Sequence, residues 1–307
     1  MTAIVGRAPV VLLGATASGK SAVALAAAQE ASLATPVEIV VVDSMQVYRG
    51  MDIGTAKPTA TERAAVRHHG IDLVEPTEDF TVADYRGAYD AAVDDLTARG
   101  HRALLVAGTG LYLRAVIDGL TPPGRWPDLR AELECEPSTE ALHARLDELD
   151  PEAARRMEPT NRRRVIRALE VCVGSGRPFS SFGPGLTSYP ATDTIQIGLR
   201  WPRDVLARRV EARFHQMMAA GLLDEVRRLV ATRKCLSRTA GQALGYKELL
   251  AHLQGELPLD EAVDLAVSRT RRYAVRQLRW FQRDPRVRWV EMGSDDAMAV
   301  LVAALSR

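Results

Sequence analysis

Short apolar runs and longer amphipathic stretches alternate along the first third of the chain. The apolar runs cover residues 9–14, 37–44 and 102–108 and are rich in valine, leucine and isoleucine. Runs of this length and composition predict buried strands, and the stretches between them, residues 19–33 and 82–99, predict helices. This alternation is typical of an α/β fold in which helices cover both faces of a parallel sheet.

The pattern changes after residue 120. Residues 121–127 (TPPGRWP) and 174–185 (GSGRPFSSFGPG) are rich in proline and glycine and predict two loops. Between them, residues 128–173 have the polar, broken periodicity of short helices. We therefore predict a helical insertion domain at residues 121–190.

The chain then returns to the pattern of the first third. Residues 194–200 (TIQIGLR) predict another strand of the sheet, and long amphipathic helices are expected at about residues 203–220 and 260–283. The predicted core domain thus combines residues 1–120 with residues 191–307, and its C-terminal region is helical.

Length and composition limit the classes of protein to which the chain can belong. The 307 residues, 47% apolar and 26% charged, suffice for one large hydrophobic core or two modest ones. We expect a cytoplasmic protein without a membrane segment, because neither an apolar signal segment nor a long uncharged apolar run is present. Cys135, Cys172 and Cys235 are widely spaced, so they favour reduced thiols over a disulfide framework or a zinc site.

Charge is distributed unevenly along the chain. The net charge is +1, but residues 1–150 carry 13 Lys and Arg against 22 Asp and Glu, and residues 151–307 carry 27 against 17. A basic half suits a polyanionic partner such as a nucleic acid. A solvated helical surface of mixed charge would give the same count, and both interpretations stay open.

A phosphate-binding motif follows the first predicted strand. GATASGKS fits G-x-x-x-x-G-K-[ST], and it precedes a predicted helix, which is the context that this P-loop motif requires. Loop amides and the helix N-terminus would bind the anion, Lys20 would contact its oxygens, and Ser21 would hold Mg²⁺. The predicted diphosphate-binding residues are Gly14, Ala15, Thr16, Ala17, Ser18, Gly19, Lys20 and Ser21.

The motif alone does not say whether phosphate is transferred. Most such loops bind nucleotides such as ATP in triphosphatases and kinases, which place an acid at a strand end. The strand at residues 102–108 leads into GTG without an acid, whereas Asp43 ends the second predicted strand. Asp43 could accept a substrate proton or cap the next turn. A group transferase, a small-molecule kinase and a non-catalytic RNA-binding protein remain possible.

Eight motifs together are more specific than any one of them. In order they are GATASGKS, DSMQVYRGMDIGTAKP, HHGIDLVEP, GTGLYLRAVIDGL, NRRRVIRALEV, RFHQMMAAGLLDEV, GQALGYKEL and TRRYAVRQLRWF. Their order and spacing resemble the bacterial tRNA dimethylallyltransferases, also called tRNA isopentenyltransferases. The resemblance covers nearly the whole chain, from about Pro9 to Trp289.

The resemblance implies a prenyl transfer in which diphosphate is the leaving group. Members of this family transfer the dimethylallyl group of dimethylallyl diphosphate to the exocyclic amine of adenosine 37, giving N6-isopentenyladenosine. Their substrates are tRNAs that read codons beginning with U. We accordingly expect the tRNA anticodon stem-loop as partner, Mg²⁺ as cofactor and a monomeric protein. The alternative is a P-loop small-molecule or nucleoside kinase, which would form ADP from ATP.

The resemblance also assigns catalytic roles. Asp43 would be the general base that accepts the amine proton. Lys20 and Thr16 would hold the departing diphosphate with the loop amides, and the family pattern adds Arg164 and Arg213. Arginine suits this task because its planar guanidinium can donate to two phosphate oxygens at once.

Further residues match tRNA contacts of the family. The acceptor base has to leave the stacked anticodon loop before it can react. The expected tRNA-binding residues are Asp43, Ser44, Met45, Gln46, Thr109, Arg130, Arg163, Arg164, Arg167, Gln242 and Tyr246. For Tyr246 the alternative is a core aromatic. Six arginines between residues 269 and 283 could in addition follow the backbone of the anticodon stem.

Overall fold

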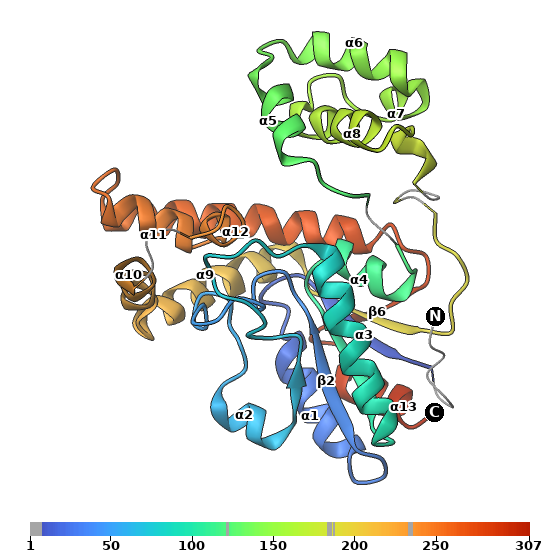
Figure 1. The fold of residues 1–307 in the computed structure, drawn as a ribbon. Coiled ribbons are helices and arrows are strands. Elements are labelled where there is room, and N and C mark those ends of the chain that lie inside the picture. Colours follow the sequence, from blue (N-terminus) through green and yellow to red (C-terminus); the bar gives the residue numbers. More distant parts are fainter. Residues whose placement is uncertain (1–7, 121–122, 183–185, 187, 233–235) are drawn as a thin grey trace. The chain divides into compact units, whose positions relative to one another are not determined.

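The chain folds into two compact units. The computed structural model describes residues 8–120, 123–182, 186, 188–232 and 236–307, so residues 183–185 of the second predicted loop and Cys235 lie outside it. The core unit contains Met1–Asp118 and Ala191–Arg307, and the insertion unit contains Gly119–Pro190 (Figure 1). In the described part of the chain no helix combines the length and apolar content needed to cross a bilayer.

A six-stranded sheet forms the centre of the core unit. Its strands pair in the order β3-β2-β4-β1-β5-β6 and are all parallel. They are β1 (Val10–Gly14), β2 (Val37–Val42), β3 (His68–His69), β4 (Arg102–Ala107), β5 (Ile195–Arg200) and β6 (Val287–Glu291). Because all strands run the same way, their carboxyl ends share one edge, where ligands of such sheets bind. The predicted α/β fold is thus confirmed.

Alternate residues of each strand face two helical layers. On β1, Val10 and Leu12 pack with α1 (Lys20–Ala31) and α13 (Ala297–Leu305), whereas Val11 and Leu13 pack toward α3 (Val82–Ala98) and α4 (Gly110–Ile117). This alternation follows from the period of two along a strand. Both faces of the sheet are therefore buried.

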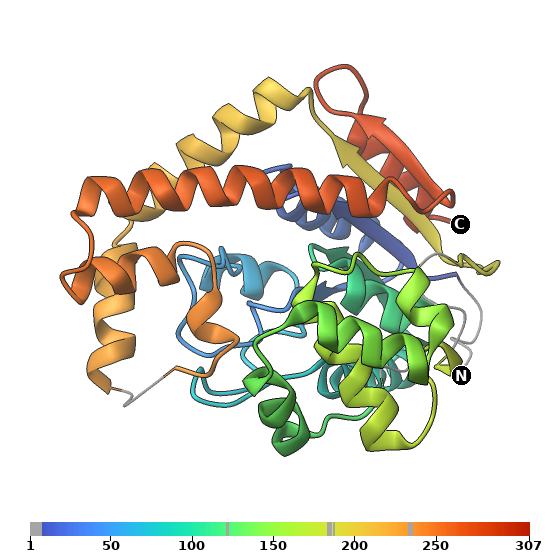
Figure 2. The same ribbon diagram turned by 90° about the horizontal axis from the view of Figure 1, so that it is seen from above.

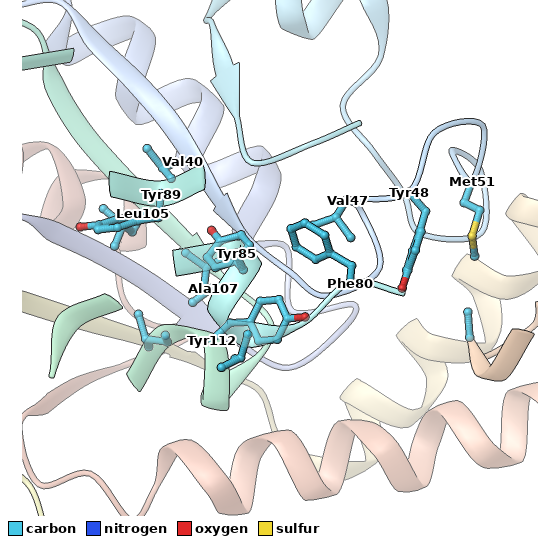
Figure 3. Packing of buried hydrophobic residues seen from close by; sticks show 14 of the residues in the cluster. Val40, Val47, Tyr48, Met51, Phe80, Tyr85, Tyr89, Leu105, Ala107 and Tyr112 are labelled. Atoms are coloured by element: carbon cyan, nitrogen blue, oxygen red, sulfur yellow. The ribbon is translucent and has the colours of Figure 1, made fainter. Parts of the chain in front are cut away.

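An aromatic pair stabilises the second of these layers. Tyr85 of α3 and Tyr112 of α4 lie with ring centroids 4.8 Å apart, and they pack against Val40 and Leu105 of the sheet (Figure 3). The Tyr85 hydroxyl donates to the Val41 carbonyl at 2.7 Å, so this buried polar group is satisfied. The pair fixes the start of α4 close to the carboxyl edge.

The longest helix, α12 (Leu259–Phe281), packs against several elements of the core unit. It contacts α4, β1, α9 (Arg203–Ala219) and α11 (Tyr246–Leu253) (Figure 2). The remaining elements of this part are α2 (Ala60–Ala65), α10 (Leu222–Thr232) and a 3₁₀ turn at Ala240–Gln242. Through these contacts α12 reaches the carboxyl edge of the sheet.

The insertion unit is a small helical unit with its own core. Its helices are α5 (Pro127–Cys135), α6 (Thr139–Leu149), α7 (Pro151–Arg155) and α8 (Arg162–Ser175), followed by a 3₁₀ turn at Phe179–Ser181. Leucines 133, 142, 146 and 169 form its centre with Val165. Cys135 is an exposed and Cys172 a buried free thiol.

Most strand predictions agree with the structure to within one or two residues, but the C-terminal region differs. Residues 284–307, assigned only to a helical region, contribute strand β6 and helix α13. The short elements α2 and β3 were also not predicted. None of these additions lies in the phosphate-binding motif or in residues 43–58.

Candidate active site

The backbone of the phosphate loop turns so that its amides point to one side. Ala17 and Gly19 have φ values of 61° and 93°, both in the left-handed region, and α1 begins directly after Gly19. Alternation of such residues with right-handed ones directs successive amides to one side. At Gly14 an added Cβ would lie 2.7 Å from the Ser18 hydroxyl and 3.3 Å from the Leu199 carbonyl, so only glycine fits.

Two side chains hold the outer, carbonyl side of this loop. The Trp201 indole donates to the Ser18 carbonyl at 2.9 Å, and Arg209 Nε donates to the Ala17 carbonyl at 2.8 Å. The Arg209 guanidinium also lies 4.6 Å from the centroid of the Trp201 ring, a cation–π contact. These contacts fix the carbonyls outward and so keep the amides available to an anion. The sequence analysis missed both residues.

Gln277 of α12 joins the phosphate loop to the turn after β4. Its Oε1 accepts from the Thr16 amide at 2.9 Å, and its Nε2 donates to the Gly108 carbonyl at 2.6 Å. The side chain is only 8% exposed, so both bonds form away from water. Gln277 lies in the quoted motif TRRYAVRQLRWF, but sequence reasoning gave it no role.

The amides of Met45 and Gln46 donate to only one of the two carboxylate oxygens of Asp43. Oδ1 accepts from the Met45 amide at 2.8 Å and is 3.4 Å from the Gln46 amide, so it caps the turn after β2. A Cβ added to Gly108 would lie 2.8 Å from Oδ2 and 3.7 Å from Lys20 Nζ. Oδ2 and the Lys20 ammonium therefore flank Gly108, and Oδ2 remains available to a substrate.

Two cations converge beside Asp43. Burial lowers the pKa of Lys20 to about 8, with a further contribution from the Arg213 charge, while Asp43 opposes the shift. Burial also lowers the pKa of Arg213, with Arg209 acting in the same direction. Lys20, Asp43 and Arg213 line one cavity of about 310 Å³. A site that holds two partly buried cations beside each other favours an anionic ligand.

Several predicted RNA-binding residues lie next to Asp43. Thr109 Oγ1 accepts from the Ser44 amide at 3.1 Å and bonds the Ser44 hydroxyl at 3.3 Å. The Tyr273 hydroxyl is hydrogen-bonded to Thr109 and Gln277, and burial raises its pKa to about 12. Gln46 uses its amide nitrogen on the Thr55 carbonyl at 3.0 Å. Met45 is partly buried against the core, so the DSMQ segment is firmly held.

Tyr246 lies in the core of its unit. The residue is fully buried, and its hydroxyl donates to Glu225 at 2.5 Å. The same carboxylate accepts from the amides of residues 52–54 at 3.0, 2.8 and 3.2 Å. Tyr246 thus has the position of a core aromatic that supports this turn, and its contact with tRNA stays a prediction. Gln242, by contrast, is exposed, and its Oε1 accepts from Lys247 at 3.1 Å.

The other predicted arginines belong to the insertion unit. Arg130 and Arg167 form ion pairs with the buried carboxylate of Glu170, at 3.3 and 3.0 Å. Arg163 and Arg164 are exposed on the first turn of α8. The roles of these four residues in tRNA binding, and of Arg164 in diphosphate binding, stay predictions.

The predicted metal ligand lies on the first turn of α1. Ser21 is exposed beside Lys20 and lines the same cavity. Among the described residues no group of three or more His, Cys, Asp or Glu side chains gathers to hold a metal. Such a donor set fits Mg²⁺, which keeps several waters and takes most of its other ligands from a bound phosphate.

Comparison with known proteins gives this arrangement a family. Residues 46–284 match the IPP transferase family, and residues 9–75 match the isopentenyl transferase family. The chain belongs to the IPP transferase family. The IPP transferase match begins at Gln46, the last residue of the DSMQ segment, and continues through α12.

Relatives and a solved structure agree over nearly the whole IPP transferase chain. A tRNA dimethylallyltransferase of Kineococcus radiotolerans is 48% identical over 293 residues, which is 93% of this chain and 92% of the relative. One of Thermobifida fusca is 47% identical over 94% and 91% of the two chains. The crystal structure of the tRNA isopentenylpyrophosphate transferase of Bacillus halodurans matches with a TM-score of 0.69 and 37% identity, covering 98% and 97%.

Substitution of Gln277 tests the link between the two turns of the IPP transferase. Gln277→Leu leaves the Thr16 amide and the Gly108 carbonyl without their partner. We expect kcat to fall by about tenfold to hundredfold, because small displacements of aligned groups have large effects on rate. Affinity for tRNA should change little. Steady-state kinetics at saturating substrates and a tRNA binding titration measure the two effects.

Two further variants separate positioning from a general loss of folding. Gln282→Leu makes the same change at an exposed glutamine just after α12 and should leave kcat unchanged. Gln277→Glu retains an acceptor for Thr16 but loses the donor to Gly108, so its kcat should also fall. Thermal melting establishes that each variant is folded. A folded Gln277→Leu protein with the wild-type kcat would contradict the role.

The pKa of Lys20 predicts how diphosphate binding depends on pH. In the free protein Lys20 has a pKa of about 8, lowered mainly by burial, so the ammonium is lost as the pH rises above that value. We expect the affinity for inorganic diphosphate, measured by calorimetry, to fall about tenfold per unit of pH above about 8. Lys20→Arg keeps its charge and should remove this fall. Constant wild-type affinity up to about pH 10 would refute the assignment.

Proposed function

We propose that this chain transfers the dimethylallyl group of dimethylallyl diphosphate to the exocyclic amine of adenosine 37 in tRNAs that read codons beginning with U. As an IPP transferase it is a tRNA dimethylallyltransferase that prenylates a tRNA adenosine. The observation that carries the finer proposal is the meeting of Lys20, Arg213 and Asp43 Oδ2 at one cavity. The family and the absence of an acid in the GTG turn both weigh against a kinase.

Asp43 is the proposed general base. The lone pair of an adenine exocyclic amine is delocalised into the ring, so the amine is a weak nucleophile. In the proposed step the amine nitrogen bonds to the allylic carbon, the carbon–oxygen bond breaks, and its electron pair leaves with diphosphate. Asp43 Oδ2 takes the amine proton, which is worth about 10²–10⁴-fold in rate.

The cations and amides of the loop are the proposed holders of the leaving group. Negative charge grows on the diphosphate as the bond breaks, and preorganised donors stabilise it most at that moment. Lys20 and Arg213 supply full charges, and the α1 N-terminus supplies a partial one. Ser21 is the residue that would hold Mg²⁺, which when bound neutralises further diphosphate charge.

A stripe of arginines on α12 is the proposed contact with the tRNA backbone. Arg272, Arg276 and Arg279 are exposed and, at steps of four and three residues, lie on one face of the helix, and the exposed Arg283 follows two residues after the helix ends. No acidic side chain in the described part of the chain pairs with any of them. Gln277, by contrast, is buried. The stripe therefore offers unpaired guanidinium groups beside the proposed active site, as phosphate contacts require.

One experiment tests the function and the base together. Bulk tRNA is incubated with the protein, Mg²⁺ and dimethylallyl diphosphate, and its anticodon-loop fragments are analysed by mass spectrometry. We expect one added dimethylallyl group on adenosine 37, and about 10²–10⁴-fold slower addition with Asp43→Asn, which keeps the capping oxygen but loses the basic one. Binding of tRNA by the variant should persist.

The controls use a different substrate and a different aspartate. ATP in place of the prenyl donor should yield no ADP, and formation of ADP without prenylated tRNA would establish the kinase instead. Asp296 caps α13 through the Ala299 amide and is exposed, so Asp296→Asn makes the matched change at another cap. It should leave the rate unchanged. A normal rate with Asp43→Asn would remove Asp43 from the base role.

The arginine stripe predicts a change in the salt dependence of tRNA binding. Replacing Arg272, Arg276 and Arg279 together by Gln should weaken tRNA binding and lower the slope of log K against log salt by about 2 to 3. Arg288→Gln alters an exposed arginine on β6 and serves as the control. An unchanged slope in the triple variant would place the RNA backbone elsewhere. Filter binding at several salt concentrations supplies the slopes.

A further inference from the structure

An apolar slot continues from the polar end of the cavity. The cavity of about 310 Å³ that contains Lys20 and Asp43 also has Ala24, Leu25, Ile39, Val41 and His68 in its wall. We use the term prenyl slot for the part lined by these five residues. It lies wholly within the core unit, between α1 and the strands β2 and β3.

The slot follows from the periodicities of one strand and one helix. Ile39 and Val41 face the α1 side of β2, and Asp43 is the next residue in that alternate series. Ala24 and Leu25 of α1 come four residues after Lys20 and Ser21, so all four lie on one helix face. Every polar group of the reaction is thus at one end, and an aliphatic surface lies directly beneath it.

The geometry of substitution directs the alkyl chain into this slot. In a displacement the entering nitrogen and the leaving oxygen lie on opposite sides of the reacting carbon, so the remaining carbons point away from that line. The phosphate loop follows β1 and Asp43 follows β2, with β4 between them, so the line runs across the strands. The slot runs along β2, at right angles to that line.

Four of the five slot residues are aliphatic, which favours an aliphatic chain as the occupant of the slot, although Gln46, Lys57 and Glu62 also line the cavity. Ala24, Leu25, Ile39 and Val41 carry neither an aromatic ring nor a side-chain hydrogen-bonding group. A nucleobase is normally held by stacking and by hydrogen bonds to its edge, and these four residues offer neither. The ring and polar edge of the slot belong to His68, which pairs with Ile39 at the end away from Asp43. Building on the function proposed above, we propose that the slot binds the dimethylallyl chain and that Leu25 and His68 limit its length.

The dimensions of the slot limit the length of the alkyl chain that it can hold. Along β2, Val41 lies about 7 Å and Ile39 about 13 Å from Asp43, at about 3.3 Å per residue. A five-carbon donor, with bonds of about 1.5 Å, ends near Val41 and Leu25. A ten-carbon chain would extend to His68. That imidazole donates from Nδ1 to the Val66 carbonyl at 2.7 Å, and burial lowers its pKa, so it presents a neutral but polar edge to the chain.

Variants that fill, enlarge or extend the slot test the proposal. Leu25→Phe should lower kcat/KM for dimethylallyl diphosphate at least tenfold through KM, without changing tRNA affinity. Leu25→Ala and His68→Leu should each raise the use of geranyl diphosphate, relative to dimethylallyl diphosphate, at least fivefold. Leu33→Ala, at a leucine that is 90% exposed, is the matched control and should change neither ratio. Thermal melting is measured for every variant.

The outcomes separate this proposal from the function on which it rests. Wild-type protein that forms no prenylated tRNA would overturn both. Wild-type product, together with folded Leu25 and His68 variants of unchanged donor preference, would overturn the slot alone. If Leu25→Phe lowers the affinity for tRNA and leaves the KM for the donor normal, the slot binds the nucleobase and the proposal is wrong. If Leu25→Phe does not fold, the donor ratios of the other two variants decide the question.

Discussion

The amide of Gln277 determines how two turns of the site lie relative to each other. β1 and β4 are neighbours, with Leu13 opposite Ala107, so the phosphate loop and the GTG turn leave the sheet side by side. Beyond the strand ends no ladder holds them together, and Gln277 supplies one acceptor and one donor there. Losing such a buried partner costs about 1–3 kcal/mol per peptide group left unpaired. The separation of the leaving-group site from Asp43 therefore depends on sheet register and on one side chain.

The charges of Lys20 and Arg213 add to this geometry a preference for an anion. Lys20 and Arg213 lie close enough for Arg213 to contribute to the lowered pKa of Lys20. Trp201 and Arg209 bind the carbonyls of Ser18 and Ala17, so these two carbonyls are held away from the anion site. Two partly buried cations beside each other are unfavourable by themselves, and an anion between them relieves the repulsion. The same feature selects a diphosphate and stabilises it as it leaves.

Features that depend on residues close together in the sequence could be predicted. The strands, the phosphate loop and Asp43 could be predicted because each depends on a pattern of a few consecutive residues. Gln277 and Arg209 could not, since they act on loops 261 and 192 residues away, and periodicity assigns a helix face without naming its partner. The buried contact of Tyr246 could not be predicted for the same reason. Its partner Glu225 occurs in a charged helix segment, where nothing local shows that the carboxylate is buried against residues 52–54.

The capping and catalytic interpretations of Asp43 do not compete, because they use different oxygens. The bond from the Met45 amide to Oδ1 fixes the carboxylate, and Oδ2 then faces Gly108, where any Cβ would lie 2.8 Å away. The lack of a side chain at position 108 is thus a condition for the base. The alternate series Ile39, Val41 and Asp43 adds an aliphatic surface below it. One strand with a period of two therefore places a proton acceptor and a surface for an alkyl chain at adjacent positions, as a reaction between an amine and a prenyl diphosphate needs.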